Sequence, residues 1–223
     1  MSYTKLLAQT SKALRGETRK ALQANHLVWQ QEMPMFRLNA PEHLNDWVVG
    51  CDQDIGGFSR AKLDITPQGT VPKDAKIARS GYAAIRSKKL PRSLFSETYW
   101  DTSPFRYLAL RVKGDDRKYL VNIRGASFMK TDLYQHRLFL RTPGQWETVH
   151  IPFRYFTLTN NGAFVAQDIG MFREKIETVG LSLSDKHQGP FRLEIDWIKA
   201  YNTNETDGDN DRLIYEHQPM NLF

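Results

Sequence analysis

The strongest constraint on the fold is a period of two in the placement of apolar side chains, which begins at Met33 and continues to Tyr201. In residues 107–113, for example, Leu108, Leu110 and Val112 alternate with the other side chains and so share one face of a strand. The same alternation predicts strands along most of the chain. The candidates are residues 36–38, 46–51, 58–65, 75–87, 106–113, 118–124, 134–141, 147–152, 178–184 and 191–201.

Turn sequences separate these strands, among them residues 56–57, 114–116, 143–144 and 160–162. Almost no helical pattern lies between the strands. The sequence therefore predicts an all-β fold, either an antiparallel β-sandwich or a barrel. The longest connection, residues 154–175, is expected to be a loop with a short helix near 167–174.

The alternation also predicts which way the side chains of the last strand point. Leu193, Ile195 and Trp197 are expected on one face, and the charged residues 192, 194 and 196 on the other. Glu194 and Asp196 would then lie about 6.5–7 Å apart. That spacing suits an acid–base pair or a calcium site. A charged strand face in contact with solvent explains the pair more simply, because Arg192 shares that face.

The two ends of the chain differ in composition from the stretch between them. Residues 2–22 predict an amphipathic helix with aliphatic side chains on one arc and cations on the opposite arc. Lys5, Leu6, Lys12 and Arg15 on this helix are candidate membrane contacts. A cleaved transit peptide is the alternative for residues 1–23, which are basic and poor in acids.

These differences divide the chain into three parts. We expect an N-terminal amphipathic helix in residues 1–24 and a β-sandwich domain in residues 29–201. Residues 202–223 are expected to form a polar linker and a C-terminal tail.

The charge and the cysteine content restrict the environment and the partners. The net charge of +6 favours anionic partners, including an anionic lipid surface. The cations are spread along the chain rather than concentrated in one block, so nucleic acid is not an expected partner. Cys51 is the single cysteine, which rules out an intramolecular disulfide and favours a reducing compartment.

Signatures of catalysis are missing from the sequence. It has neither a nucleotide-binding glycine motif after a strand nor a nucleophile elbow, and its histidines are scattered. We therefore expect no catalytic residues, no cofactor and no metal site. Asp54, Gly56 and Gly57 are interpreted as a structural turn, in which the aspartate caps the backbone and glycine supplies a positive φ.

A candidate binding surface combines cations with aromatic side chains. If the arginines of the predicted strands converge, their planar donors suit carboxylates or phosphates. Cross-strand pairing with acidic residues is the alternative. The candidate residues are Arg79, Tyr82, Arg86, Arg124 and Arg137 in or beside strands, with Tyr155, Phe156 and Phe164 in the long connection.

Several short motifs, each weak alone, follow one another in a specific order. The first two are Asp54-Ile55-Gly56-Gly57-Phe58-Ser59 and Arg79-Ser80-Gly81-Tyr82. The others are residues 107–115, 119–123, 146, 151–153, 156, 180–183, 189–198, 215–216 and 221–223. Together they resemble the complex I intermediate-associated protein 30 family. The chain departs from the family pattern at residues 66–77, where the segment is short, holds two prolines and suggests a truncated edge strand.

The resemblance implies a fold and a function. The implied fold is a galactose-binding-like jelly roll. The implied protein is a non-catalytic assembly factor, or chaperone, in the mitochondrial matrix and peripheral to the inner membrane. It would bind a membrane-arm assembly intermediate of respiratory complex I together with other assembly factors. A different function remains open at this point, because the same fold also supports a carbohydrate-binding module or a glycan-acting enzyme.

Overall fold

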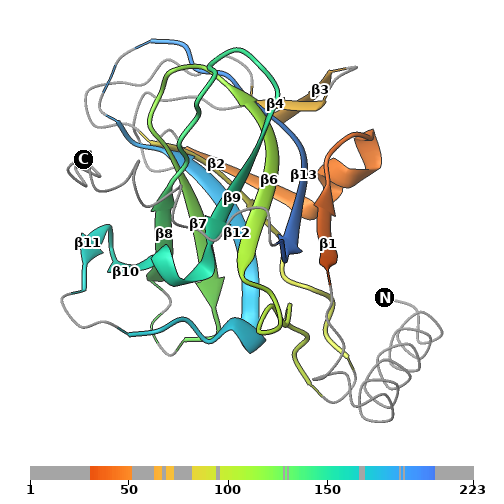
Figure 1. Ribbon diagram of the computed structural model, residues 1–223, viewed down its shortest axis with the longest axis vertical. Coiled ribbons are helices and arrows are strands. Elements are labelled where there is room, and N and C mark those ends of the chain that lie inside the picture. Colours follow the sequence, from red (N-terminus) through yellow and green to blue (C-terminus); the bar gives the residue numbers. More distant parts are fainter. Residues whose placement is uncertain are drawn as a thin grey trace.

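The chain folds into two antiparallel β-sheets that face each other across one apolar core (Figure 1). The computed structural model describes residues 31–51, 63–66, 69–72, 82–93, 96–127, 129, 131–165, 169–185, 187 and 189–203. The predicted N-terminal helix, the turn with Asp54, Gly56 and Gly57, and the C-terminal tail lie outside these residues. The described strands confirm the predicted antiparallel sandwich.

The first sheet has six strands, in the order β3-β4-β13-β6-β9, with β1 also paired to β13. Its strands are β1 (Glu32–Arg37), β3 (Leu63–Thr66), β4 (Gly69–Pro72), β6 (Tyr107–Gly114), β9 (Glu147–Pro152) and β13 (Leu193–Tyr201). The strand β4 occupies the short segment that holds the two prolines. It pairs with β13 at Thr70 alone and with β3 at four positions, so β3, and not this segment, forms the edge of the sheet.

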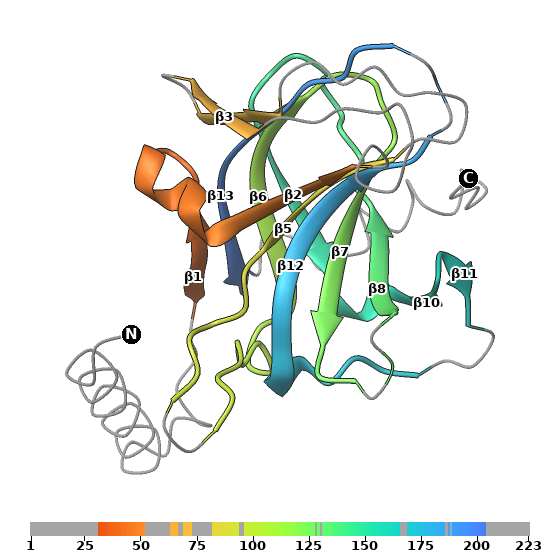
Figure 2. The same cartoon turned by 180° about the vertical axis from the view of Figure 1, so that it is seen from behind.

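The second sheet has seven strands, in the order β11-β10-β8-β7-β12-β5-β2. They are β2 (Trp47–Cys51), β5 (Ala83–Ser87), β7 (Tyr119–Gly125), β8 (Asp132–Arg137), β10 (Thr157–Asn160), β11 (Ala163–Phe164) and β12 (Ile176–Leu183). Short 3-10 turns accompany the strands at η2 (Pro41–Asp46), η4 (Phe153–Tyr155) and η5 (Arg173–Lys175). Figure 2 shows this sheet from its outer side.

The core forms where the alternating apolar positions of the two sheets meet. Leu108, Leu110 and Val112 of β6 are fully buried, as the alternation predicts. They share one core with Val121 and Ile123 of β7 in the opposite sheet. Each such side chain stabilises the fold by about 1.5–3 kcal/mol through burial.

The prediction of which side chains of β13 face the core is wrong beyond Ile195. The pairing with β6 shifts between Ile195 and Trp197, so that Asp196 is an extra residue in the ladder. After this β-bulge the alternation is reversed, so that the side chains predicted to face outward point into the core. Ile198 is therefore buried in the core and Trp197 is half-buried outside it. Glu194 was expected to face solvent but is only 2% exposed. Its Oε1 forms an ion pair with Arg192 Nη2 at 2.8 Å.

The long connection 154–175 also differs from the expectation. It contains a hairpin of β10 and β11 around Asn161 and Gly162, which both have positive φ values. The turn sequence signals this hairpin, but strands of four and two residues are too short for the periodicity to reveal. The expected helix near 167–174 is wrong over its described part, because residues 169–172 are irregular and a 3-10 turn begins at Arg173.

Candidate binding surfaces

Three of the predicted arginines share the outer face of the seven-stranded sheet, the side away from the core. The inner face is identified by buried core residues such as Ile85, Val121 and Leu181. Arg86 lies next to Ile85 on β5, and its cross-strand partner Gly180 pairs in turn with Asn122 of β7. Alternation along the strands places Arg124 of β7 on the same side. Arg137 of β8 pairs with Leu120 and also faces outward.

The strand pairing places these arginines around Asn122. Arg124 is two residues along β7 from Asn122, or about 7 Å. Arg86 is two strands away, or about 10 Å. Arg137 lies on the neighbouring strand β8, displaced from Asn122 by two residues in the direction opposite to Arg124. The Cα atoms of Arg137 and Asn122 are therefore about 8 Å apart. The sequence therefore identified three arginines that the fold brings together, although they belong to three different strands.

A row of hydrogen-bonded polar side chains crosses four strands at the centre of this face. Asn122 Nδ2 donates to Ser182 Oγ at 2.9 Å, and Gln135 Nε2 donates to Asn122 Oδ1 at 2.7 Å. The hydroxyl of Thr159 lies 3.0 Å from both Gln135 Oε1 and the Leu133 carbonyl oxygen, and its one proton can be donated to either. We call Ser182, Asn122, Gln135 and Thr159 the polar row. Alternation along the observed strands places these four positions on the side away from the core, and their mutual contacts depend on the register between strands.

The three arginines differ in their surroundings. The Nε of Arg124 lies 3.5 Å from Glu177, which also accepts a hydrogen bond from Lys89 at 2.7 Å. The guanidinium of Arg137 stacks on the ring of Phe139 at 4.8 Å, and its buried Nε makes no hydrogen bond to a described residue. Arg86 is exposed. The predicted alternative, pairing with acidic residues, holds for Arg124 alone among the three.

The other predicted surface residues do not join this group as one site. Phe156 is a core residue with 7% exposure, packed against His136, so its placement on a surface was wrong. Tyr155 lies under Arg154 in η4. Tyr82 is half-buried just before β5, and Arg79 lies outside the described residues. Phe164 pairs with Thr159 at the edge of the outer face and is 45% exposed.

The exposed large apolar side chains come from two neighbouring segments of the chain. Among the described residues these are Met129, Phe164, Ile169 and Phe172, with exposures of 57, 45, 43 and 66%. They come from the β7–β8 turn and from residues 161–175, which lie side by side because Ala126 N donates to Lys175 O at 2.9 Å. Figures 1 and 2 show the β7–β8 turn and the start of β12 at one end of the sandwich, with β11 at its side. We call these four residues the apolar end.

The sequence analysis identified one residue of the apolar end, Phe164, and missed the other three. Ile169 and Phe172 lie in the stretch where a short helix was expected, and neither was named as a binding residue. The signal available in the sequence was the presence of large apolar residues in a long connection, where a solvent-facing loop would not need them.

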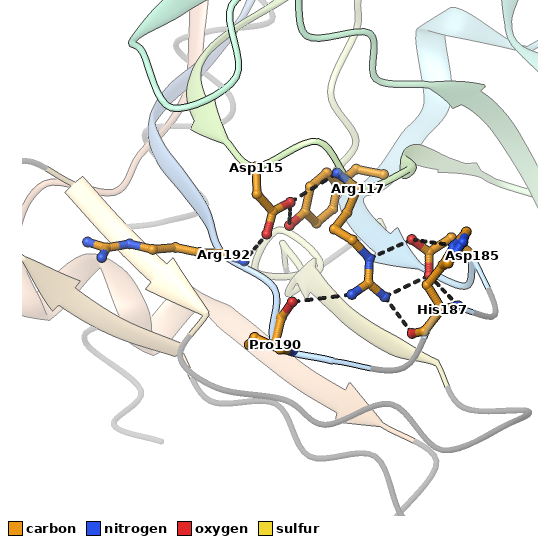
Figure 3. Close-up of polar contacts among 7 residues, drawn as sticks. Asp115, Arg117, Asp185, His187, Pro190 and Arg192 are labelled. Atoms are coloured by element: carbon orange, nitrogen blue, oxygen red, sulfur yellow. Dashed lines mark hydrogen bonds and ion pairs between the residues drawn. The ribbon is translucent and has the colours of Figure 1, made fainter.

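The opposite end of the sandwich is held by a buried ion pair (Figure 3). Arg117 Nε and Nη2 donate to the carboxylate of Asp185 at 2.6 and 2.8 Å, and Arg117 also donates to the carbonyls of His187 and Pro190. The Asp185 side chain is 1% exposed. Burial alone would raise the pKa of Asp185, but the Arg117 guanidinium and the His187 amide outweigh this effect and hold it below its usual value. The contact ties the β6–β7 turn to the connection before β13.

A neighbouring carboxylate extends this network. Asp115 accepts hydrogen bonds from the Tyr119 hydroxyl at 2.8 Å and from the Arg192 amide at 2.7 Å. Burial, with the adjacent negative charge of Asp115, raises the pKa of the Tyr119 phenol well above its usual range. Tyr119 therefore stays a neutral hydrogen-bond donor, and the network positions loops rather than reactive groups.

The half-buried tryptophans on the outer side of the six-stranded sheet lie beneath cations. Arg111 lies 5.7 Å from the ring centre of Trp146, and Lys199 lies 4.6 Å from that of Trp197. Trp47 is buried, and Trp100 packs against the core.

Within the described residues, His, Cys, Asp and Glu side chains form no group of three that could hold a metal ion. No helix there has the length and apolarity to cross a bilayer.

Comparison with known proteins places these surfaces in a family. The family model described as complex I intermediate-associated protein 30 matches residues 36–195. The chain belongs to this family. The match confirms the resemblance inferred from the short motifs, and it spans the polar row, the three arginines, the apolar end and the Arg117–Asp185 pair.

Curated relatives carry the family name in several organisms. Complex I intermediate-associated protein 30, mitochondrial, from Neurospora crassa is 36% identical over 202 residues, which cover 75% of this chain and 73% of the relative. The protein of the same name from Mus musculus is 34% identical and covers 93% of this chain. That from Drosophila melanogaster is 32% identical and covers 74%. The matches span 66% of the mouse relative and 61% of the fly relative.

Solved structures support the fold of this family member. A family 11 carbohydrate-binding module from Clostridium thermocellum, in complex with a mixed-linked tetrasaccharide, has a TM-score of 0.55 and 17% identity. The match covers 78% of this chain and 95% of the module. The same module from a cellulosomal cellulase has a TM-score of 0.56 and 16% identity, covering 77% and 95%. The expected jelly-roll sandwich is confirmed, and the likeness is one of fold alone.

Proposed function

We propose that the chain is a non-catalytic assembly factor for mitochondrial respiratory complex I, which acts by binding proteins of a membrane-arm assembly intermediate together with other assembly factors. Membership of the family and the names of the relatives support the role in assembly. The same names support a mitochondrial location. We place the protein in the matrix, peripheral to the inner membrane.

The apolar end is the observation that supports protein binding as the mode of action. Large apolar side chains that gather on one exposed region usually contact another molecule. Phenylalanine and methionine are enriched at the centre of protein interfaces, and methionine adapts to different partners. Polar and charged residues, including Asp132, Glu174 and Lys175, border the cluster in the sequence, as in the rim of an interface. Full burial of such side chains contributes about 1.5–3 kcal/mol each, before ordering costs.

Affinity isolation from mitochondria tests this proposal. The tagged protein should recover complex I membrane-arm subunits, and the double variant Phe164→Ser, Phe172→Ser should lose most of this recovery. A matched control changes two exposed residues at the opposite end of the sandwich, Lys118→Ser and Gln145→Ser. The control should behave as the unaltered chain. Equal recovery by both variants would contradict binding through the apolar end.

The alternative function, recognition of carbohydrate, receives less support from the geometry. Stacking on a sugar requires exposed aromatic faces. Trp146 and Trp197 are instead half-buried, with the cations of Arg111 and Lys199 over their rings. We therefore favour protein binding.

The N-terminal segment adds a membrane contact to the proposal. Lys5, Leu6, Lys12 and Arg15 lie outside the described residues, and their role rests on the amphipathic pattern of the sequence. Weak, salt-sensitive binding to an anionic lipid surface is expected from that pattern. Deletion of residues 1–22 should abolish sedimentation with cardiolipin-containing vesicles at low salt. Vesicle binding that survives the deletion would argue against this contact.

A further inference from the structure

Phe172 is the most exposed of the four residues of the apolar end, with 66% of its surface open to solvent. Other apolar residues of the same connection reach the interior. Met171, directly before it, packs against the core, and Ile176 at the start of β12 is completely buried. Burial of an aromatic ring is favourable, so the outward position of Phe172 requires a structural cause.

Buried hydrogen bonds fix the backbone immediately after Phe172. The amide and the hydroxyl of Thr102 both donate to the carbonyl oxygen of Arg173, at 2.7 and 3.1 Å, and Thr102 is completely buried. The guanidinium of Arg173 also contacts a core residue, because its Nη1 donates to the carbonyl oxygen of Phe105 at 2.7 Å. Arg173 is therefore held by both its backbone and its side chain.

The backbone is fixed on the far sides as well. The hydroxyl of Tyr134 donates to the carbonyl oxygen of Gly170 at 3.2 Å, two residues before Phe172. Four residues after Phe172, Ile176 exchanges two backbone hydrogen bonds with Trp100, at 2.9 and 3.1 Å. The fold thus holds the backbone of Phe172 in one position, and only the two torsions of its side chain remain free.

An exposed aromatic ring on a fixed backbone is suited to insertion into a pocket on another protein. Binding costs less conformational entropy when the inserted group is already ordered, so preorganisation raises affinity. Aromatic anchors in pockets supply much of the binding energy at protein interfaces. An anionic lipid surface fits less well, because the exposed residues that follow, Glu174 and Lys175, have opposite charges and give no net attraction.

We propose that Phe172 is a preorganised anchor, which inserts its ring into an apolar pocket on a protein of the membrane-arm assembly intermediate. Arg173 and Thr102 are positioning residues, which affect binding through the placement of this ring. The inference rests on the proposed function for the identity of the partner. It goes further in assigning one side chain as the anchor and two buried contacts as the cause of its exposure.

Titration of the tagged full chain into a detergent-solubilised mitochondrial extract, from cells that lack the endogenous protein, tests the inference. Recovery of complex I membrane-arm subunits at each concentration gives an apparent affinity. Arg173→Gln should weaken this affinity about two- to tenfold, as expected for loss of one ordering hydrogen bond. Thr102→Val keeps the size of a buried side chain that cannot touch the partner, and it should act in the same direction. It also provides the test if Arg173→Gln does not fold.

A double-mutant cycle separates positioning from general stability. Once Phe172→Ser has removed the ring, adding Arg173→Gln or Thr102→Val should weaken the affinity by less than about twofold, because the residues are coupled. Losses that multiply in the double variants would overturn the inference, as would an unchanged affinity in both single positioning variants. The control Arg92→Gln removes the same charge at a position with 75% side-chain exposure and should bind as the unaltered chain.

Hydrogen exchange in the unbound chain gives a readout that needs no partner. The amides of Thr102, Lys175 and Ile176 donate hydrogen bonds within this anchored region and should be protected. In Arg173→Gln they should exchange faster, while the amides of β7 stay protected. Rapid exchange at all three in the unaltered chain would show that the segment is not preorganised and would overturn the inference.

Cardiolipin-containing vesicles test the other class of partner. Sedimentation with these vesicles should be the same for Phe172→Ser and the unaltered chain. Loss of vesicle binding in Phe172→Ser, with recovery of complex I subunits unchanged, would overturn the inference in favour of a membrane contact. Recovery that requires Phe164 and Phe172 but does not respond to either positioning variant would reject the inference and leave the proposed function standing. Absence of recovery with the unaltered chain would reject both.

Discussion

The buried ion pair of Arg117 and Asp185 gives the sharpest stability prediction. The substitution Asp185→Asn keeps the size of the side chain and removes its charge. The side chains of Asp185 and Arg117 are 1% and 15% exposed, so solvent cannot replace the lost interaction fully. Loss of one partner of a buried pair typically costs about 3–5 kcal/mol. Arg117 retains its bonds to the carbonyls of His187 and Pro190, so we expect the lower end of this range, about 3 kcal/mol.

Thermal unfolding followed by circular dichroism measures the effect. For a domain of this size, about 3 kcal/mol corresponds to a decrease in Tm of about 6–12 °C. The control is Glu97→Gln, which breaks the exposed pair with Arg92, where the side chains are 38% and 75% exposed. Exposed pairs contribute about 0–1 kcal/mol, so this variant should melt close to the unaltered protein.

The pH dependence gives the prediction a second readout. The pKa of Asp185 is lowered in the folded state, so its contribution to stability is present above the ordinary aspartate pKa and is lost as pH falls through the folded value. The difference in Tm between the unaltered protein and Asp185→Asn should therefore hold at neutral pH and shrink below about pH 4. Equal melting of Asp185→Asn and Glu97→Gln at pH 7 would refute the assignment of this pair as a stabilising contact.

Two further predictions concern single residues. Burial lowers the pKa of His136 to about 4, so the unfolded state takes up a proton at a higher pH than the folded state, and stability should fall by about 3 kcal/mol between pH 7 and 4. Denaturant unfolding of His136→Gln should lack this part of the pH dependence, and an unchanged profile would contradict it. Gly180→Ala should destabilise severely or prevent folding, because its Cβ would lie 2.5 Å from the Ile85 carbonyl oxygen. Gly162→Ala, in open space at φ 79°, should cost only about 1 kcal/mol, and melts in the reverse order would disprove this comparison.

The sequence alone determined the β-class of the chain and most of its core. Alternation depends on the geometry of the strand itself, in which neighbouring side chains point to opposite faces. Leu108, Leu110 and Val112 could therefore be assigned to the core without knowledge of their partners. The sequence also marked Arg86 and Arg124 as candidate binding residues. The short motifs identified the family because their combination and order are specific to it, although each motif alone is weak.

The tertiary structure decided what the local rule could not express. The extra residue Asp196 reverses the faces of β13, because a bulge depends on the pairing with β6. Phe156 was placed on a surface and lies in the core, since burial of a loop residue depends on which elements fold over it. The polar row and the apolar end each join residues from segments distant in sequence. Register across strands, and the packing of one connection beside another, bring those residues together, and no period within a single strand encodes either.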